Sequence, residues 1–325
     1  MEQQFQLLVD MKIKNVGIIG IGSYVPNNIV TNEDIDSTGI GTNSNWTKEK
    51  LGIERRNISI VENTSDLGYH ASINAIQDAK IDIKDIDLII FVTSSPDRIS
   101  PSTACIMAEK LQLKCPAFDV NAVCTGFVYG IELATSLINS NKYKNILLVA
   151  SETYSKITDW EDRNCVFFGD GAGAVVLSTV EDGWISTNVF SDGTGKEHFT
   201  CHHGEKFHMN GQAVYEFGTT KLPTTILNSL NENDLTVDDI SWIVPHQPSI
   251  RILEKTAEVL DIPVDKVVLN MTNNANTAGA SIPMALDKIY KENKIKNNDI
   301  LVLPAVGSGW TWGVAIIKYK TNENL

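Results

Sequence analysis

The chain has 325 residues, 42% of them hydrophobic, and its 27 Lys and Arg against 40 Asp and Glu give a formal net charge of −13. This length and composition predict a globular protein with two packed halves. The acidic balance argues against nucleic acid as the main partner, and no apolar stretch reaches the length of a membrane span. Five scattered cysteines do not form a disulfide pattern, so we expect a cytoplasmic protein.

The first strand is expected to begin at Lys12, which leaves residues 1–11 as an N-terminal extension. The apolar patch at 5–9 is too short, and too weakly flanked by positive charge, for a signal peptide. We then expect an N-terminal half over 12–180 and a C-terminal half over 181–325.

Two segments of the chain recur at one spacing. DIDLII at 85–90 resembles DISWIV at 239–244, and NILLV at 145–149 resembles DILVL at 299–303. Both offsets are 154 residues (239 − 85 and 299 − 145). This internal repeat predicts two halves of similar structure. The alternative is that βα sequences resemble one another in general.

Helical patterns at 65–80 and 219–231 precede the repeated strands, which predicts βα units and largely parallel sheets. Duplicated halves of this kind suggest two similar layers packed face to face. The helical pattern at 125–142 is apolar nearly all round, as expected for a helix enclosed between two sheets.

Cys124 stands where an expected buried strand over 116–123 gives way to the helix at 125–142. Unpaired N–H groups and the positive end of the helix dipole stabilise a thiolate at such a position, so Cys124 is a candidate nucleophile. The alternative is a buried structural cysteine, because free cysteine is common in protein cores.

Two further polar residues follow expected strands. Asn276 lies within two residues of the repeat counterpart of Cys124, and His246 follows the strand that begins at Ile240. Cys124, His246 and Asn276 are therefore all expected at C-terminal strand ends, the edge at which parallel sheets bind ligands.

With these three residues in place, the chain resembles β-ketoacyl-acyl carrier protein synthase III, a condensing enzyme of the thiolase superfamily. The resemblance runs from Lys12 to Lys320 and rests on six segments in order: GIGSYVP at 20–26, AFDV at 117–120, FGDGAGA at 168–174, VPHQ at 244–247, NT at 276–277 and GSGWTWG at 307–313. It implies an α/β fold, a five-layered αβαβα thiolase-like sandwich from two duplicated βα halves, and a homodimer.

The resemblance implies a Cys-His-Asn triad. Cys124 would attack an acyl-CoA thioester and hold the acyl group, because a thiolate both accepts and donates acyl groups. Malonyl-acyl carrier protein would then lose carbon dioxide, with His246 and Asn276 donating hydrogen bonds to the thioester carbonyl. The backbone N–H groups of Cys124 and Ser308 would form the other oxyanion hole. No cofactor or metal is implied, since coenzyme A enters as the thioester substrate.

Two other functions stay open. An acyltransferase would pass the acyl group from Cys124 to an oxygen or nitrogen nucleophile without decarboxylation, and a non-catalytic paralogue would act as a binding subunit. His246 and Asn276 favour decarboxylation, because simple transfer needs less of the second oxyanion hole. The complete triad argues against the paralogue.

The resemblance also implies the substrate contacts. Trp46 and Arg163 would stack on the two faces of the adenine, and Lys50 would bind a phosphate. Tyr215 would line the pantetheine tunnel, and Ser249 would stand at a pantetheine contact. A separate position caps the acyl pocket and is occupied by Ser100. This small residue would leave room for a longer or branched acyl group.

The carrier-protein face departs from the family pattern. Arg251 remains, but Glu216, Glu258 and Val259 stand where basic residues are common. An acidic chain repels an acidic carrier unless a basic patch persists, and the candidates for such a patch are Lys206 and Lys255. This favours a pathway-specific enzyme over ordinary initiation of fatty-acid synthesis.

A polar segment is crowded with His198, Cys201, His202, His203 and His208. Tracts of this kind can bind zinc. The spacing matches no standard site, so we expect a solvated or tunnel-lining loop and no metal.

Overall fold

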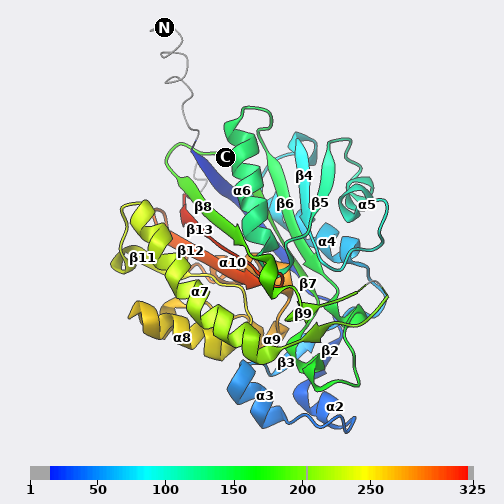
Figure 1. The fold of residues 1–325 in the computed structure, drawn as a ribbon. Helices are drawn as coiled ribbons and strands as arrows, with labels where there is room; N and C mark the ends of the chain where they lie inside the picture. The colour runs from blue at the N-terminus through cyan, green and yellow to red at the C-terminus, as the bar shows by residue number, and fades with distance from the viewer. Residues whose placement is uncertain (1–14, 203, 321–325) are drawn as a thin grey trace, which may run out of the picture.

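The computed structural model describes residues 15–202 and 204–320. The expected extension at 1–11 and His203 therefore lie outside the described residues. Two sheets and the helices around them make up most of the molecule (Figure 1).

The first sheet has five strands in the order β1-β7-β6-β4-β5. The strand bounds are β1 Val16–Tyr24, β4 Leu88–Val92, β5 Ala117–Val120, β6 Ile146–Glu152 and β7 Gly171–Thr179. Strand β4 pairs in parallel with both β5 and β6, so that Ile89 lies opposite Ala117 on one side and Leu147 on the other. Strand β7 is antiparallel to β6 and β1.

The second sheet repeats this arrangement in the order β11-β12-β13-β8. Its bounds are β8 Trp184–Ser191, β11 Ile240–Ile243, β12 Ile300–Gly307 and β13 Thr311–Lys318. A parallel bridge between Ile243 and Val267 stands where the first sheet has β5. Because β7 ends at Thr179 and β8 begins at Trp184, each half of the chain forms one sheet.

The expectation of largely parallel sheets was wrong. Two of the four strand pairs in the first sheet are antiparallel, and so are two of the three in the second. Parallel neighbours need a helical crossover. The β12–β13 connection is a tight turn at 308–310, and β6 reaches β7 through short 3-10 turns, so each chain segment returns antiparallel.

Three helical layers enclose the two sheets. The outer face of the first sheet packs against α4 Thr64–Ala79 and α5 Thr103–Lys110, and the outer face of the second against α7 Gly211–Glu232 and α8 Ile250–Leu260. Between the sheets lie α6 Gly126–Asn139 and α10 Ser281–Lys291. The fold is therefore the expected five-layered αβαβα sandwich.

The other elements are short. They are β2 Ile29–Thr31, β3 Arg55–Asn57, β9 Phe199–Thr200, β10 His208–Met209, α2 Asn32–Asp36, α3 Ser44–Leu51, α9 Met271–Asn274, and the 3-10 turns η1 Ile83–Asp85, η2 Val123–Thr125, η3 Tyr154–Lys156, η4 Arg163–Phe167, η5 Gly193–Gly195, η6 Val237–Asp239, η7 Val264–Lys266 and η8 Ala278–Ala280. No helix in the described ranges has the length and apolar character to cross a membrane.

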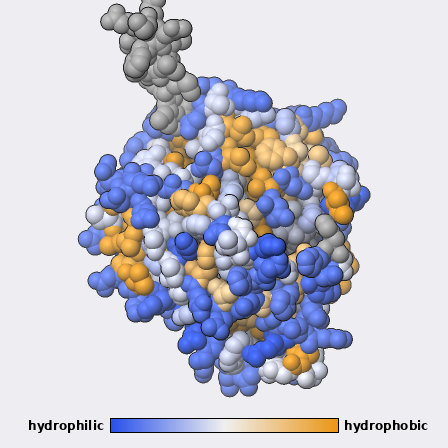
Figure 2. Space-filling model, viewed as in Figure 1, coloured by the Kyte–Doolittle hydropathy of each residue, from blue (hydrophilic) through white to orange (hydrophobic). Residues whose placement is uncertain are grey.

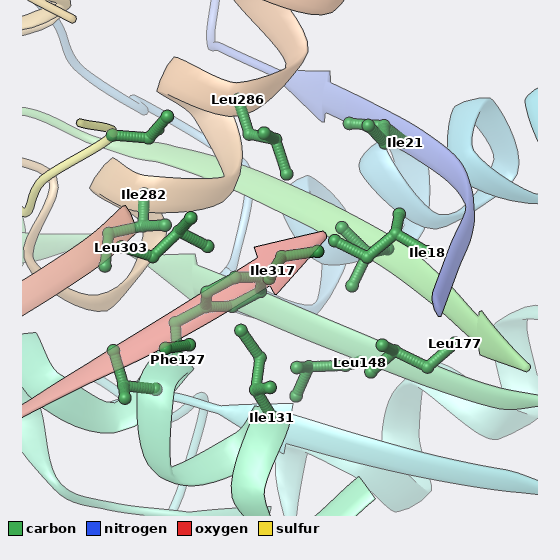
Figure 3. Packing of buried hydrophobic residues seen from close by; sticks show 14 of the residues in the cluster. Ile18, Ile21, Phe127, Ile131, Leu148, Leu177, Ile282, Leu286, Leu303 and Ile317 are labelled. Carbon is green, nitrogen blue, oxygen red and sulfur yellow. The ribbon is translucent and has the colours of Figure 1, made fainter. Parts of the chain in front are cut away.

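The central core lies between the two sheets (Figure 3). Phe127 and Ile131 of α6 are fully buried there, and Leu286 of α10 comes from the other side of the layer. They meet side chains such as Leu148 from the first sheet and Ile317 from the second. The predicted enclosure of the apolar helix after Cys124 is thus confirmed, and this helix fixes the position of the cysteine at its start.

The strand before Cys124 differs from its prediction. A buried strand was expected over 116–123, but β5 spans Ala117–Val120 and is largely half-buried. Within the part of the chain that the structure describes, it is the terminal strand of its sheet and pairs with β4 alone, so one edge faces outward. Phe118 on this strand is 37% exposed.

Candidate active site

Cys124 lies in η2, the sharp turn that joins β5 to α6. Val123 in this turn has φ of 50°, a left-handed conformation that β-branched residues rarely adopt. The corresponding turn of the second half, η8, has Ala278 at φ of 44°, and the two turns contact each other. Both halves therefore hold a strained turn, and the turns bring Cys124 and Asn276 to the centre of the molecule.

Burial dominates the electrostatics of Cys124. The residue is 8% exposed, and burial, with a smaller effect of the nearby Glu152 carboxyl, raises the pKa of the thiol. The expectation of a stabilised thiolate therefore does not hold for the resting site, because desolvation penalises the charged form. Helix α6 begins two residues after Cys124. The positive end of its dipole stabilises the thiolate that forms when Cys124 reacts.

His246 and Asn276 form a hydrogen-bonded pair, with Nε2 of the imidazole 3.0 Å from Oδ1 of the amide. The backbone N–H of Ala278 also donates to this Oδ1, at 2.8 Å, which identifies the atom as the amide oxygen. The imidazole must therefore carry its proton on Nε2. The Nδ2 group of Asn276 is left to donate toward a ligand in the cavity.

The backbone around the pair is held on both sides. The amide of Gln247 donates to the carbonyls of Pro245 and Val268 and accepts from the N–H groups of Asn270 and Met271. Asn276 N–H donates to the Phe167 carbonyl at 3.0 Å, and its own carbonyl accepts from Gly169. Gln247 was not among the residues predicted for the site, although its place directly after His246 in VPHQ was a signal.

We expect His246 to make the protein sensitive to acid. Burial lowers its pKa to about 4, against an ordinary value of 6.5. Between these values the unfolded chain binds the proton and the folded chain does not, so stability falls as the pH falls through this window. The expected loss is about 2 kcal/mol between about pH 7.5 and pH 5.

Urea unfolding of the unmodified protein and of His246→Ala, at both pH values, measures this difference. The variant lacks the group, so its stability should decline less with acid by about the same 2 kcal/mol. Parallel pH dependence in the two proteins would show that His246 already titrates normally in the folded state.

The segments that bear Cys124 and Ser308, predicted to form the oxyanion hole for the acyl group, are η2 and the β12–β13 turn, and η2 packs against the ends of β12 and β13. A Cβ atom added to Gly307 would lie 3.1 Å from the backbone nitrogen of Cys124, so glycine is what permits this close approach. The Thr311 hydroxyl lies 3.2 Å from the carbonyls of both Ala122 and Ser308, and so ties the turn to the segment before Cys124. This packing brings the backbone nitrogen of Cys124 next to the turn that bears Ser308.

A cavity of about 500 Å³ runs from Cys124 to the surface. Nearly all the residues predicted for the site line it: Trp46, Lys50, Cys124, Arg163, Tyr215, His246, Ser249, Arg251, Asn276 and Ser308. Ser100 does not line it, and lies exposed on the loop between β4 and α5. The expected acyl-pocket cap is thus not supplied by Ser100 of the same chain, because this loop follows β4 toward the outer edge of the first sheet.

The surface end of the cavity carries a cation–π pair. The guanidinium carbon of Arg163 lies 5.0 Å from the centroid of the Trp46 ring. A flat aromatic group entering here would separate the two faces and stack on both of them, which suits a purine.

The His/Cys segment has no described metal site. Residues 15–202 and 204–320 contain no group of three or more His, Cys, Asp or Glu placed to hold a metal ion. Cys201 is exposed, and His198 stacks on Trp310 with ring centroids 5.4 Å apart. His198 therefore packs over the β12–β13 turn.

One buried group near Cys124 was missed by the sequence analysis. Glu152, at the end of β6, is fully buried and accepts hydrogen bonds from backbone and hydroxyl groups of residues 93–95. Burial raises its pKa to about 7, although these hydrogen bonds act in the opposite direction. An isolated Glu at a strand end gives no sequence signal of this kind.

The chain is similar to known proteins over most of its length. Family models described as 3-oxoacyl-[acyl-carrier-protein (ACP)] synthase III and as its C terminal match residues 118–193 and 230–319. Beta-ketoacyl-[acyl-carrier-protein] synthase III of Clostridium acetobutylicum is 42% identical over 94% of this chain and 99% of its own. That of Ehrlichia canis is 43% identical over 93% of this chain and 98% of its own. The crystal structure of 3-oxoacyl-[acyl-carrier-protein] synthase III from Aquifex aeolicus has a TM-score of 0.91 at 35% identity, covering 94% of this chain and all of that one.

Proposed function

Because the chain belongs to the β-ketoacyl-acyl carrier protein synthase III family, we propose that Cys124, His246 and Asn276 perform its acyl-CoA-primed condensation with malonyl-acyl carrier protein. The observation that carries this assignment is the hydrogen-bonded His246–Asn276 pair, which shares a cavity with Cys124. The enzyme is a transferase of the condensing type. The acyltransferase alternative needs less of this pair, because simple acyl transfer forms no enolate.

In the first half-reaction, the Cys124 sulfur attacks the thioester carbonyl of acyl-CoA. The carbon–sulfur bond to coenzyme A breaks, and coenzyme A leaves as a thiol with the proton that Cys124 gives up. The backbone N–H groups of Cys124 and Ser308 stabilise the oxyanion. Trp46, Arg163 and Lys50 line the outer part of the cavity, where they suit the adenine and phosphates of coenzyme A.

In the second half-reaction, the malonyl thioester loses carbon dioxide and becomes an enolate. When the malonyl thioester binds, its carbonyl oxygen takes the Nε2–H of His246 in place of Asn276 Oδ1. This N–H and the Nδ2 group of Asn276 then stabilise the enolate oxygen by hydrogen bonds. The enolate carbon attacks the acyl-Cys124 carbonyl, a carbon–carbon bond forms, and the Cys124 thiolate leaves and is reprotonated. His246 stays neutral throughout, in agreement with its lowered pKa.

The experiment that tests this function combines two readouts. The protein is incubated with acetyl-CoA and malonyl-acyl carrier protein while carbon dioxide release and the β-ketoacyl product are measured. Intact mass of the enzyme in the absence of malonyl-acyl carrier protein reports acylation. Acylation without carbon dioxide release, but with transfer to an oxygen or nitrogen acceptor, would support the acyltransferase instead.

The homodimer is proposed from the free edge of the first sheet. Among residues 15–202 and 204–320, no strand pairs with the outer edge of β5. Phe118 on β5 and Leu133 on α6 are 37% and 38% exposed. Apolar residues gather over α6 and the neighbouring strands in Figure 2. A second copy placed against β5 would continue the sheet and cover these side chains. Ser100 follows β4 beside this edge, so it can cap an acyl pocket only in a second copy.

We also propose a reducing, cytoplasmic location. Cys105 and Cys201 are exposed and free, and Cys115 is partly exposed and free. Exposed thiols in this number persist as thiols in a reducing compartment.

The carrier face supports a pathway-specific partner. Glu216 is exposed one residue after the cavity-lining Tyr215, and Glu258 is exposed and pairs with Lys255 at 2.7 Å. Of the two candidate basic residues, Lys255 is thus neutralised, and Lys206 donates to the backbone carbonyl of Lys156. Like charges across an interface lower affinity and association rate, so an acidic carrier would meet a weak surface here.

We therefore expect the double variant Glu216→Lys, Glu258→Lys to improve turnover with a generic acidic fatty-acid carrier by roughly three- to tenfold, mainly through a lower KM. The gain should shrink at high salt, which screens exposed charges. Acyl-CoA priming should stay unchanged. Glu109→Lys on α5, in the opposite outer layer, is the charge control for each of the single variants Glu216→Lys and Glu258→Lys. Efficient use of the generic carrier by the unmodified enzyme, with no change in the double variant at low salt, would show that these residues do not face the carrier.

A further inference from the structure

A buried arginine lies beneath one wall of the active-site cavity. Arg56 on strand β3 is fully buried, whereas the preceding residue of the same strand, Arg55, is exposed. Burial lowers the pKa of the Arg56 guanidinium to about 10, so the group is still charged at neutral pH. Its hydrogen-bond acceptors in the described part of the chain are two backbone carbonyls and one side-chain amide, all of them uncharged.

Overall stability does not explain a cation in this position. Moving a charge out of water is costly, and uncharged acceptors offset this cost only in part. An apolar residue of similar volume often stabilises a protein interior as well as a buried ionic group does. In addition, the Nε–H of Arg56 has no acceptor within residues 15–202 and 204–320. The bonds that Arg56 does make therefore indicate its purpose.

The guanidinium joins segments that are distant in sequence. Its Nη2 donates to Oδ1 of Asn32 and to the carbonyl of Val166, both at 2.9 Å. Its Nη1 donates to the carbonyl of Val30 at 3.3 Å. Val30 lies in β2 and Asn32 is the first residue of α2, whereas Val166 belongs to η4, 110 residues after Arg56. Arg56 thus attaches η4 to the β2–β3 hairpin.

The segment that Arg56 holds serves both ends of the cavity. η4 begins at Arg163, the residue proposed to stack on the adenine of coenzyme A. It ends at Phe167, whose carbonyl accepts the backbone N–H of Asn276 at 3.0 Å. The position of η4 therefore affects the surface end of the cavity through Arg163 and the catalytic end through Asn276.

The chain after η4 packs closely on β3. A Cβ atom added to Gly169 would lie 2.5 Å from the carbonyl oxygen of Asn274 and 3.0 Å from the Cβ of Arg56, so glycine is what permits this approach. Strand β3 also contacts α9, and the N–H of Glu54 donates to the carbonyl of Thr272 in α9 at 2.9 Å. Arg56 therefore stands where β3, η4 and the segment around α9 meet.

We propose that Arg56 is a positioning residue that holds η4 in place for coenzyme A binding at Arg163 and for decarboxylation at Asn276. This inference rests on the proposed function and adds to it a residue that does not line the cavity. Because one segment serves both ends, loss of the guanidinium should weaken coenzyme A binding and slow decarboxylation together. A residue that only stabilised the fold would leave both quantities unchanged in a folded variant.

The test compares Arg56→Met with Arg55→Met, the same change at the exposed neighbour on β3. In Arg56→Met, calorimetric titration should show about tenfold weaker binding of coenzyme A. Carbon dioxide release from malonyl-acyl carrier protein by the pre-acylated enzyme should fall by about tenfold or more, since small displacements of aligned groups have effects of this size. Arg55→Met should match the unmodified protein in both measurements. Urea unfolding establishes that each variant is folded.

Arg56→Lys is the conservative variant, and it also serves if Arg56→Met fails to fold. Lysine keeps the charge but replaces the planar fork by a single nitrogen, so it can restore only part of the arrangement. Its coenzyme A affinity and its rate of carbon dioxide release should lie between those of the unmodified protein and those of Arg56→Met. An unchanged value of either quantity in folded Arg56→Met would overturn the proposal, as would an equal loss in Arg55→Met.

Hydrogen exchange separates failure of this proposal from failure of the proposed function, because it needs no substrate. The N–H groups of Asn276 and Gly169 donate to the carbonyls of Phe167 and Asn276. In Arg56→Met, peptides that contain these two N–H groups should exchange at least about tenfold faster, while peptides from the central helix α6 keep their protection. This result supports the positioning role even if the unmodified protein neither acylates nor releases carbon dioxide. Unchanged exchange in these peptides would overturn the role whatever the activity.

Discussion

Cys124→Ala is expected to abolish covalent acylation by acyl-CoA and to reduce condensation to background. Among the described residues that line the cavity, Cys124 alone carries a thiol, so no neighbour can take its place. The loss should exceed roughly a thousandfold, as for the removal of other covalent nucleophiles. Intact mass after incubation with acetyl-CoA measures the effect directly, with an acetyl adduct in the unmodified protein and none in the variant.

The matched control for this experiment is Cys165→Ala. Cys165 is also fully buried and free, but it packs in the cluster around the second sheet and does not line the cavity. The Cys165→Ala variant should be acylated like the unmodified protein. An acetyl adduct that persists in Cys124→Ala and maps to the exposed Cys105 or Cys201 would assign the reaction to a surface thiol and remove the basis of the mechanism.

The overall architecture could be predicted because local hydrophobic patterns of the sequence indicate its strands and helices, and these patterns repeat in the two halves. The 154-residue offset places β6 and β12 in corresponding positions, and the all-apolar helix after Cys124 required cover on two sides. Strand direction could not be predicted in the same way. It depends on whether a connection crosses the sheet, and the turn at 308–310 shows this only when the chain is folded.

The site was predictable as a list of residues, since most of them follow strands or stand in short motifs. Its electrostatics were not. The pKa of Cys124 depends on burial by segments that are distant in sequence, and this outweighs its place before a helix. Tyr154 and Phe207 likewise pack in one buried cluster with Cys124, although they are separated along the chain and carry no motif.

Ser100 shows the limit of a resemblance carried over residue by residue. Its position in the sequence suggested an acyl-pocket cap, yet the loop that bears it lies outside the cavity of its own chain. Sequence position alone does not show whether a loop contributes to the cavity of its own chain or to that of a second copy.

Asn276→Ala is expected to keep acylation of Cys124 and to slow decarboxylation of malonyl-acyl carrier protein by about a hundredfold or more. The side chain supplies one donor to the enolate oxygen, and its Oδ1 also orients the Nε2–H of His246 at 3.0 Å. His246→Ala should have a similar effect, whereas His246→Gln, which keeps an N–H donor, should lose less. Carbon dioxide release from the pre-acylated enzyme is the measurement, with intact mass confirming that the first half-reaction survives.

Asn274→Ala, which removes the same group two residues away and outside the cavity lining, is the control and should decarboxylate normally. Normal carbon dioxide release in Asn276→Ala would mean that the imidazole acts alone, and the paired donor arrangement would lose its catalytic role.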